Sequence, residues 1–237
     1  KEVKGWKRRG AITALAFSPD GRLLASSGED QTIVLQDVST WQTVRTVKPG
    51  FDGADSVAFS PDGKLLVAAV SQSPGCDPGM QKVRIWDVAS GELRQTISAH
   101  HRGIFTAAFS PDGKLVASGG FEDAPGLEAT AGSIKLWDAA TGRLRAVFAG
   151  DSQTRSLAFS PDGRLLATSA GEAVFLWNLV GVETLPFKDE LAEPSFARRL
   201  VELKVHQEVK SVAFSPDGRL LYTGDTDGAV RVWEIIE

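Results

Sequence analysis

Three residues near the C-terminus have the side chains of a catalytic triad. Thr223 carries a hydroxyl, His206 an imidazole and Asp227 a carboxylate, and a Ser/His/Asp-type hydrolase uses such groups as nucleophile, base and orienting acid. Hydrogen-bonded to one another, the same groups also form polar networks that fix the geometry of a protein core. We predict this structural role for the three residues, and no catalytic residue in the chain.

Few residues of the sequence could hold a metal ion or a cofactor. There are three histidines, His100, His101 and His206, and one cysteine, Cys76, so a cysteine-based zinc cluster and an internal disulfide are both excluded. Residues 225–228 resemble the start of a calcium loop but lack its third acidic position and its distal glutamate. No P-loop and no glycine-rich dinucleotide fingerprint is present. We therefore expect neither a metal nor a cofactor.

Composition and charge exclude several classes of protein. Of the 237 residues 42% are hydrophobic, and 26 Lys and Arg stand against 30 Asp and Glu, a formal net charge of −4. This composition suits a globular domain, whereas a dedicated nucleic-acid binder normally carries a basic face. No run of about 18 apolar residues and no N-terminal signal segment is present, so we expect no membrane span and a cytoplasmic protein. Because the first residue is Lys1 and not Met, we expect the sequence to begin inside a longer or processed protein.

One five-residue word, Phe-Ser-Pro-Asp-Gly, recurs five times along the chain. Its Ser, Pro, Asp and Gly suit the four positions of a type I β-turn, because proline presets the backbone of the second position and glycine tolerates the exit. Aliphatic runs flank the word, and the run before it alternates, as in residues 211–214. Two strands around a tight turn predict a β-hairpin in each repeat. The copies begin at Phe17, Phe59, Phe109, Phe159 and Phe214.

A second recurring word closes an alternating strand in each repeat, and most copies hold a tryptophan before an acidic residue. A polar alternating stretch follows the word, such as residues 93–97, and its composition suits an outer strand with a free edge. Each repeat therefore predicts four antiparallel strands, which we name a to d. The word stands at residues 35–37, 85–87, 136–138, 176–178 and 232–234.

The paired words resemble those of WD-repeat β-propellers, and the uniform short repeats are similar to those of bacterial WD-repeat proteins. The resemblance covers nearly the whole chain, although Gln36 stands at the tryptophan position of the first repeat, and Asn178 and Glu234 soften the acidic position of the last two. It implies an all-β fold of four-stranded antiparallel blades in one domain over residues 1–237. The expected units are 10–48, 54–98, 103–149, 154–205 and 209–237 plus 2–6.

Spacing predicts how the blades join. The chain ends at strand c of unit five and begins with residues 2–6, which match an orphan strand d. We therefore predict that this segment completes the last blade and closes a ring of five blades. Units two and three carry about eight or nine extra residues between strands b and c, at 71–80 and 121–132, which should share one face. A third insertion, at 180–197 between strands c and d of unit four, belongs on the other face or the rim.

The resemblance also implies a hydrogen-bond network, in which a histidine before strand a bridges to a strand b hydroxyl, a b–c turn aspartate and the strand c tryptophan. In unit five these positions are held by His206, Thr223, Asp227 and Trp233. Unit three has His100, Ser118 and Trp137, but Ala131 where the aspartate is expected, and unit one lacks both histidine and tryptophan. We expect blade five to hold the most complete network.

A ring of repeats without a catalytic constellation holds other molecules. In WD-repeat propellers the d–a and b–c loops form a mouth that takes a peptide or a partner domain. The residue that starts strand a at this mouth varies while the rest of the unit is uniform. It is Thr13, Asp55, Phe105, Arg155 and Lys210 in the five units. His101, Arg102 and Phe121 add cations and a ring near Phe105, and such residue types are enriched at binding hot spots.

We predict a non-catalytic scaffold that binds a protein or peptide partner on this d–a/b–c loop face, and neither nucleic acid nor a membrane. The alternative is an architectural or sensor propeller domain of a larger multidomain protein or complex, in contact with other domains of the same chain and without a discrete peptide site of its own.

Overall fold

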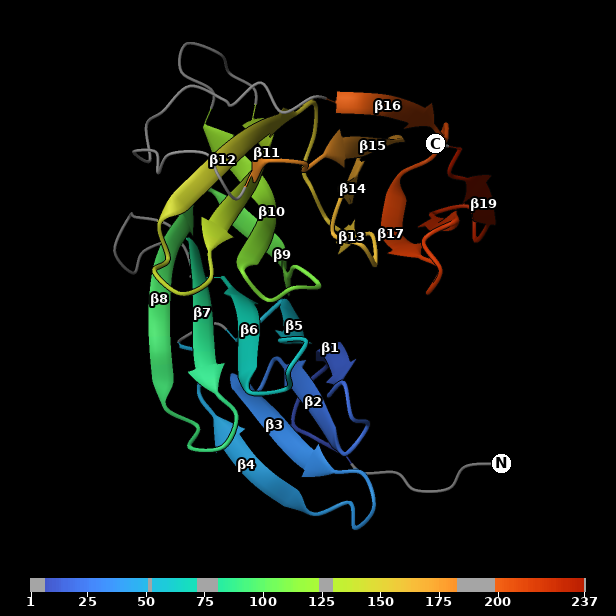
Figure 1. The fold of residues 1–237 in the computed structure, drawn as a ribbon. Helices are drawn as coiled ribbons and strands as arrows, with labels where there is room; N and C mark the ends of the chain where they lie inside the picture. The colour runs from blue at the N-terminus through green and yellow to red at the C-terminus, as the bar shows by residue number, and fades with distance from the viewer. Residues whose placement is uncertain (1–6, 51–52, 72–80, 124–129, 183–198, 237) are drawn as a thin grey trace.

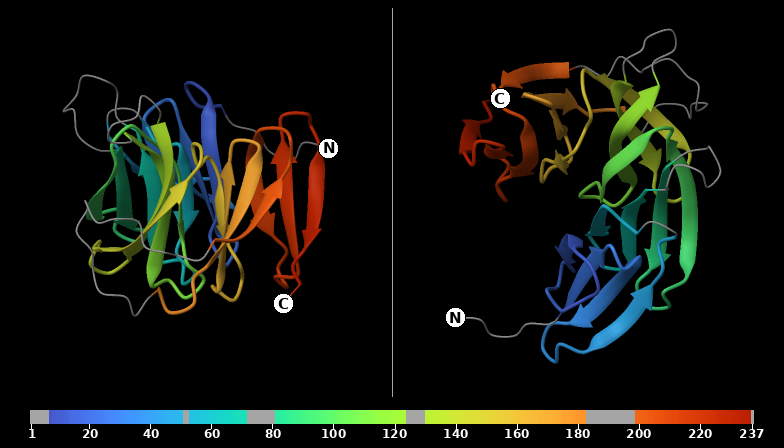
Figure 2. Two further views of the ribbon diagram at one scale, coloured as in Figure 1. Left: turned by 90° about the horizontal axis from the view of Figure 1, so that it is seen from above. Right: turned by 180° about the vertical axis from the view of Figure 1, so that it is seen from behind.

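The computed structural model of the chain describes residues 7–50, 53–71, 81–123, 130–182 and 199–236. Within these residues five antiparallel sheets follow one another and are arranged as the blades of a β-propeller (Figures 1 and 2). The described residues include no α-helix, and accordingly no helix of a length and hydropathy that would span a membrane. The predicted all-β, five-bladed fold is confirmed.

The first two blades each have four strands, and each strand is hydrogen-bonded to the next one along the chain. The strands of blade one are β1 (Ile12–Phe17), β2 (Leu23–Gly28), β3 (Thr32–Asp37) and β4 (Thr43–Val47). Those of blade two are β5 (Ser56–Phe59), β6 (Leu65–Val70), β7 (Gln81–Asp87) and β8 (Leu93–His100).

Blades three and four repeat this order, and blade five has three described strands. Blade three consists of β9 (Gly103–Phe109), β10 (Leu115–Asp123), β11 (Thr130–Asp138) and β12 (Leu144–Gly150). Blade four consists of β13 (Leu157–Phe159), β14 (Leu165–Ala170), β15 (Ala173–Asn178) and β16 (Arg199–Lys204). Blade five consists of β17 (Val209–Phe214), β18 (Leu220–Asp225) and β19 (Val230–Glu234).

Of the three predicted insertions, the structure describes paired strands in one, that of blade three. Strands β10 and β11 stay paired as far as Asp123 and Thr130, so the insertion predicted at 121–132 begins and ends by lengthening a hairpin. The insertions predicted at 71–80 and 180–197 fall mostly outside the described residues, as does the predicted strand at 2–6.

The Ser-Pro-Asp-Gly turns connect strands a and b as predicted. In blade four the Gly163 amide donates to the Ser160 carbonyl oxygen at 2.9 Å, the bond that closes a β-turn. The Ser160 hydroxyl donates to Asp162 Oδ1 at 2.5 Å and accepts the Leu165 amide at 2.9 Å. Gly163 has a φ of 72°, where a side chain would be strained. The serine hydroxyl makes the same two bonds in the other four turns.

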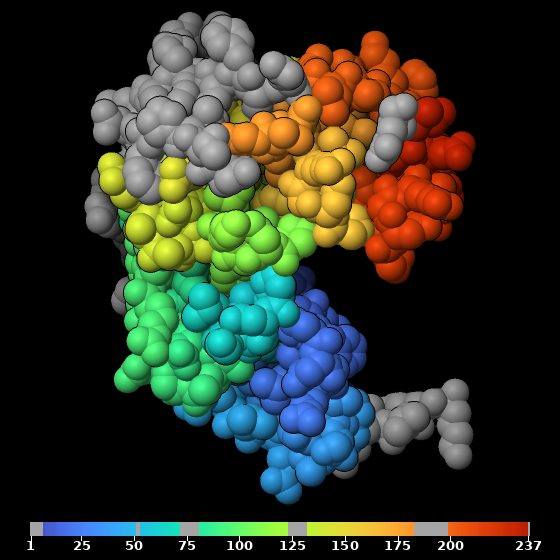
Figure 3. Space-filling view, in the orientation of Figure 1, coloured from blue at the N-terminus to red at the C-terminus, as the bar shows by residue number. Residues whose placement is uncertain are grey.

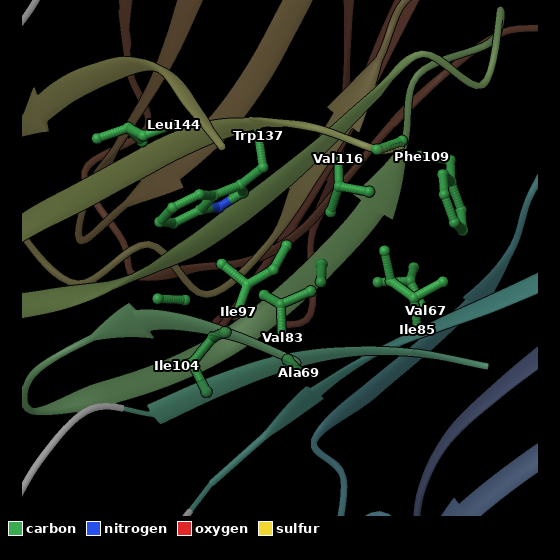
Figure 4. Packing of buried hydrophobic residues seen from close by; sticks show 13 residues of the cluster. Val67, Ala69, Val83, Ile85, Ile97, Ile104, Phe109, Val116, Trp137 and Leu144 are labelled. Atoms are coloured by element: carbon green, nitrogen blue, oxygen red, sulfur yellow. The ribbon is translucent and has the colours of Figure 1, made fainter. Parts of the chain in front are cut away.

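The hydrophobic core lies between the blades and not inside any one of them. Four clusters of buried side chains each join two neighbouring blades. In the cluster between blades two and three, Val67, Val83 and Ile85 pack with Val116 and Trp137 (Figure 4). Each blade is therefore held by the face of its neighbour, as in other stacked repeats.

The described blades form an arc whose two ends stand apart. Blade one and blade five flank the opening in Figure 2 (right), and the space-filling view shows the same opening (Figure 3). The strand predicted to close the ring, at 2–6, lies outside the described residues.

Candidate partner-binding face

The d–a and b–c loops lie together on one face of the propeller. The Val209 amide, which begins strand a of blade five, donates to the Gly171 carbonyl of the blade-four b–c turn at 2.8 Å. The Thr154 amide, between β12 and β13, donates to the Gly120 carbonyl near the end of strand b in blade three at 3.3 Å. These backbone hydrogen bonds fix the positions of the residues that begin strand a in blades four and five.

Two aromatic rings and a guanidinium stack on this face. Phe105 of β9 and Phe121 of β10 have ring centroids 5.7 Å apart with planes inclined by 15°. The Arg155 guanidinium carbon, just before β13, lies 4.9 Å from the Phe105 centroid, within the range of a cation–π contact. Gly103, which pairs with Phe121 across β9 and β10, leaves room for that ring, since a Cβ on Gly103 would stand 2.1 Å from Phe121 Cε1.

An ion-pair chain continues the stack into blade five. Arg155 Nε donates to Glu208 Oε1 at 2.9 Å, and its Nη2 donates to Gln153 Oε1 at 3.0 Å. Lys210 Nζ lies 2.6 Å from Glu208 Oε2. The hydrogen bond from Lys210, with help from Arg155, lowers the pKa of Glu208 below its ordinary value. Arg155 and Glu208 each keep 39% of their side-chain surface exposed, so a partner can contact these ion pairs.

The remaining predicted residues divide into two groups. His101 and Arg102 are exposed beside the stack, where their amides donate to Glu122 Oε2 at 2.9 Å and to the Phe121 carbonyl at 3.4 Å. The structure therefore brings together six of the eight predicted partner-binding residues, from blades three to five. We call this set the mouth patch: His101, Arg102, Phe105, Phe121, Arg155 and Lys210.

Thr13 and Asp55 stand on blades one and two, outside the mouth patch. The Thr13 hydroxyl donates to the Ala54 carbonyl at 2.6 Å and lies 2.9 Å from the Ser27 hydroxyl. Asp55 accepts a hydrogen bond from the Ser71 hydroxyl. Desolvation raises the pKa of Asp55 above its ordinary value, against this bond, which lowers it.

Beneath the mouth patch, blade three holds a complete buried network. Trp137 Nε1 donates to Ser118 Oγ at 2.9 Å, and Ser118 Oγ lies 2.9 Å from His100 Nε2. His100 Nδ1 lies 3.0 Å from Glu122 Oε1, and Lys135 Nζ lies 2.9 Å from the same carboxylate oxygen. The family pattern has an aspartate in the b–c turn, at the position of Ala131 in this blade. Glu122, near the end of strand b, supplies the carboxylate instead.

Charges within this network are set by burial and by the lysine. Burial lowers the pKa of His100, although the Glu122 carboxylate raises it, so the ring is neutral at pH 7 and donates from Nδ1 to Glu122. Burial would raise the pKa of Glu122, but His100 and Lys135 together hold it at about 2. The network is therefore one carboxylate, one ammonium and a chain of neutral donors.

The predicted network of blade five is only partly assembled. Trp233 Nε1 donates to Thr223 Oγ1 at 3.1 Å. His206 has a φ of 66° and an exposed side chain, and Asp227 is also exposed. Among the described residues no hydrogen bond joins either side chain to Thr223 or Trp233, so the most complete described network is that of blade three.

Blade one builds its network from an arginine. The Arg8 guanidinium donates to Asp30 Oδ2 at 2.8 Å, to Ser26 Oγ at 2.9 Å and to Thr32 Oγ1 at 2.6 Å. Arg8 stands nine residues before Phe17, as His100 stands nine before Phe109. This spacing could have identified Arg8 as the residue that takes the histidine position in blade one.

Ser118, His100 and Glu122 follow one another as in a hydrolase triad, yet their setting does not allow the reaction. Ser118 and His100 have no exposed surface, and the Ser118 oxygen already accepts the Trp137 N–H. A substrate carbonyl has no path to that oxygen. In the part of the chain that the structure describes, no three His, Cys, Asp or Glu side chains converge as metal ligands.

Comparisons with known proteins give similar repeat proteins. Telomerase protein component 1 of Mus musculus is 29% identical over 223 residues, which cover 93% of this chain and 7% of that protein. Apoptotic protease-activating factor 1 of Rattus norvegicus is 36% identical over 107 residues, which cover 44% of this chain and 7% of that protein. The chain thus spans a small part of both mammalian relatives.

The fold and the family are shown by two further matches. A chain in the solved structure "Crystal Structure of Mitotic Checkpoint Complex" aligns with a TM-score of 0.74 and 22% identity, over 95% of this chain and 64% of that one. The family model described as "WD domain, G-beta repeat" matches residues 2–37, 91–138, 142–178 and 197–234, more than half of the chain. The chain belongs to the WD-repeat family, a family of protein-interaction scaffolds.

Proposed function

We propose that this chain is a non-catalytic interaction domain that binds a protein or peptide partner at the mouth patch. One observation carries the proposal: the Phe121, Phe105 and Arg155 side chains form one continuous stack across two blades and are only partly buried. Side chains of this kind pack against each other in a fixed geometry before a partner arrives, so they lose little conformational freedom on binding.

The chemistry of the mouth patch suits a segment that carries an apolar side chain next to a carboxylate. The Phe121 ring offers apolar area, and His101 and Arg102 lie beside it with further donors. Lys210 adds positive charge at the other end, next to Glu208. Aromatic residues and arginine dominate the binding energy of many interfaces. A protein as the partner is further supported by the solved structural neighbour, whose title names a complex.

The test compares partner capture by three folded forms of the immobilised chain. The first is the wild type, the second is the double variant Phe105→Ala/Arg155→Ala, and the third is Arg199→Ala. Arg199 is the matched control, because its guanidinium lies 4.4 Å from the Phe175 centroid, a similar contact, but on outer strand β16. Circular dichroism and thermal unfolding establish that all three forms are folded.

We expect a protein from the source lysate to be retained by the wild type and by Arg199→Ala, and lost by the double variant. Retention by all three forms would place the binding site elsewhere and overturn the proposal. No specific capture by any form would instead favour an architectural role of the propeller within a larger assembly.

A further inference from the structure

Asp55 is an exposed carboxylate on the loop face that carries the mouth patch. It stands just before β5, and its amide donates to the Ala69 carbonyl of β6 at 2.9 Å. Within the ranges that the structure describes, its carboxylate accepts a hydrogen bond from the Ser71 hydroxyl and forms no ion pair. The acids Glu122 and Glu208, by contrast, each pair with a lysine. Asp55 therefore carries a negative charge that these parts of the chain do not balance.

The electrostatic setting of Asp55 agrees with this contact pattern. Desolvation raises its pKa, whereas neighbouring cations help to lower the pKa of Glu122 and of Glu208. A carboxylate that has lost part of its hydration without gaining a cation is stabilised when a positive group comes close to it. A cation on a partner would therefore supply what the described part of the chain does not.

Asp55 adjoins the mouth patch on the side of blade two. The Ser71 hydroxyl, which donates to Asp55, also lies 3.5 Å from the carbonyl oxygen of Ile104, the residue before Phe105 in β9. Strands β5, β9, β13 and β17 follow one another around the inside of the arc (Figure 1). Asp55 of blade two and Arg155 of blade four therefore stand on opposite sides of Phe105.

Blades four and five carry the opposite charge on the same face. Arg155 and Lys210 both pair with Glu208, at 2.9 and 2.6 Å. Two cations beside one carboxylate leave this group of three with a net positive charge. Lys210 keeps 48% of its side chain exposed, and an ammonium has three N–H donors. It can therefore donate to a carboxylate of a partner while it stays paired with Glu208.

These groups give the face an order of charge from blade two to blade five. First comes the Asp55 carboxylate, then the stacked rings of Phe105 and Phe121, and then the positive group around Lys210. In an extended peptide every second side chain points to the same side, with a spacing of about 7 Å. A cation, an apolar side chain and a carboxylate at alternate positions of one segment match this order. Complementary charges of this kind fix the register of a bound segment.

We propose that Asp55 is a cation subsite beside the mouth patch, and that the partner segment places a lysine or arginine there, an apolar side chain at Phe105 and a carboxylate at Lys210. The subsite rests on the proposed function, peptide binding at the mouth patch, and adds the direction in which charge runs along the bound segment. A segment that is acidic at both ends is disfavoured, because one of its carboxylates would lie beside Asp55.

The test measures by calorimetry the binding of three peptides with blocked ends, added at up to millimolar concentration. Their sequences are Lys-Ser-Phe-Ser-Glu, Gln-Ser-Phe-Ser-Glu and Lys-Ser-Phe-Ser-Gln. The wild type should bind the first peptide most tightly. Loss of either peptide charge should weaken binding by about three- to fivefold, which corresponds to one partly exposed ion pair.

Three variants assign the two charges to residues of the chain. Asp55→Asn keeps an acceptor for the Ser71 hydroxyl but loses the charge, so it should weaken the first peptide by about three- to fivefold and leave the second unchanged. Lys210→Gln should weaken the first peptide and leave the third unchanged. Glu92→Gln is the matched control and should change none, because Glu92 is an exposed acid of the same blade in the c–d turn, at the other end of the strands.

The outcomes separate the cation subsite from the peptide site itself. Asp55→Asn acting equally on the first and second peptides, or on neither, overturns the subsite while peptide binding stands. A wild type that binds all three peptides equally overturns the charge order in the same way. No binding of any peptide by the wild type contradicts peptide binding at the mouth patch, and the subsite fails with it. Circular dichroism checks folding, and Asp55→Ser takes the place of Asp55→Asn if that variant does not fold.

Discussion

Single residues in this propeller can be replaced as long as the donors and acceptors of a network remain in place. Blade three uses a glutamate from the end of strand b where the family pattern has a turn aspartate, and blade one uses Arg8 where blade three has His100. Arg8 also holds the pKa of Asp30 below its ordinary value, chiefly through its hydrogen bond to that carboxylate. The geometry of a blade therefore depends on the atoms presented and not on one residue type.

Glu122 is the residue on which the blade-three network depends most. The variant Glu122→Gln keeps the size of the side chain but leaves the buried Lys135 ammonium without its anion, and breaking a buried pair in this way costs about 3 kcal/mol. Urea unfolding measures the loss. Glu202→Gln is the matched control, because its pair with Arg199 lies at the surface, with 40% of the Arg199 and 32% of the Glu202 side chain exposed, and is expected to contribute less than about 1 kcal/mol. Equal losses in both variants would show that Glu122 has no special role.

The pH dependence of stability should have two windows, and the first of them reports on the blade-three network. His100 has a lowered pKa, so below its unfolded value of about 6.5 the unfolded chain binds a proton that the folded chain refuses. Stability therefore falls as the pH drops from about 7 towards 5. Glu122 has a pKa of about 2 in the folded state, as do Asp37 and Asp87 in exposed turns, and together they add a second loss as the pH falls from about 4.5 towards 2. Urea midpoints measured across this range test both windows, and His100→Gln should remove the slope of the first.

At the scale of elements, the sequence predicted what local chemistry determines and missed what the register determines. Five turns and the alternating strands around them follow from proline, glycine and period two, and the structure has them where predicted. The acid at Glu122 was missed because it depends on β10 and β11 staying paired beyond the blade. No turn motif in the sequence predicts that these two strands continue to pair. The convergence of Phe105, Phe121 and Arg155 was predicted only as a shared face, because the stacking itself depends on which blades are neighbours.

The turn serine is the part of this element whose removal is easiest to measure. In Ser160→Ala the partly buried Leu165 amide loses the hydroxyl oxygen to which it donates, and an unsatisfied donor of this kind costs about 1 kcal/mol, the lower end of the range for buried donors. Ser90→Ala is the control, because its hydroxyl also bonds an aspartate, Asp87, at 3.1 Å, but in an exposed c–d turn. We expect that variant to change the free energy of unfolding by less than about 0.5 kcal/mol. A loss of similar size in both would mean that water replaces the Ser160 hydroxyl.

At the scale of the whole molecule, stability is a sum over interfaces between neighbouring blades. Each hydrophobic cluster draws on two blades, so the blades support one another in series along the arc. The mouth patch follows this arrangement, because its stack and ion pairs cross from blade three to blade four and on to blade five. Binding at the mouth patch and packing between blades therefore depend on the same two pairs of neighbouring blades, three with four and four with five.

A shortened chain tests this serial support. Removing residues 206–237 takes away blade five and uncovers Ala167, Val174 and Leu176, which are buried against it. Losing this apolar contact should lower the Tm by more than about 5 °C and increase the fluorescence of an added hydrophobic dye. A chain that ends at Ile235 is the control, since the lost Ile236 is 85% exposed and should leave the Tm unchanged. An unchanged Tm in the longer truncation would mean that blade four is stable without its neighbour, and that each blade, not each interface, is the unit of folding.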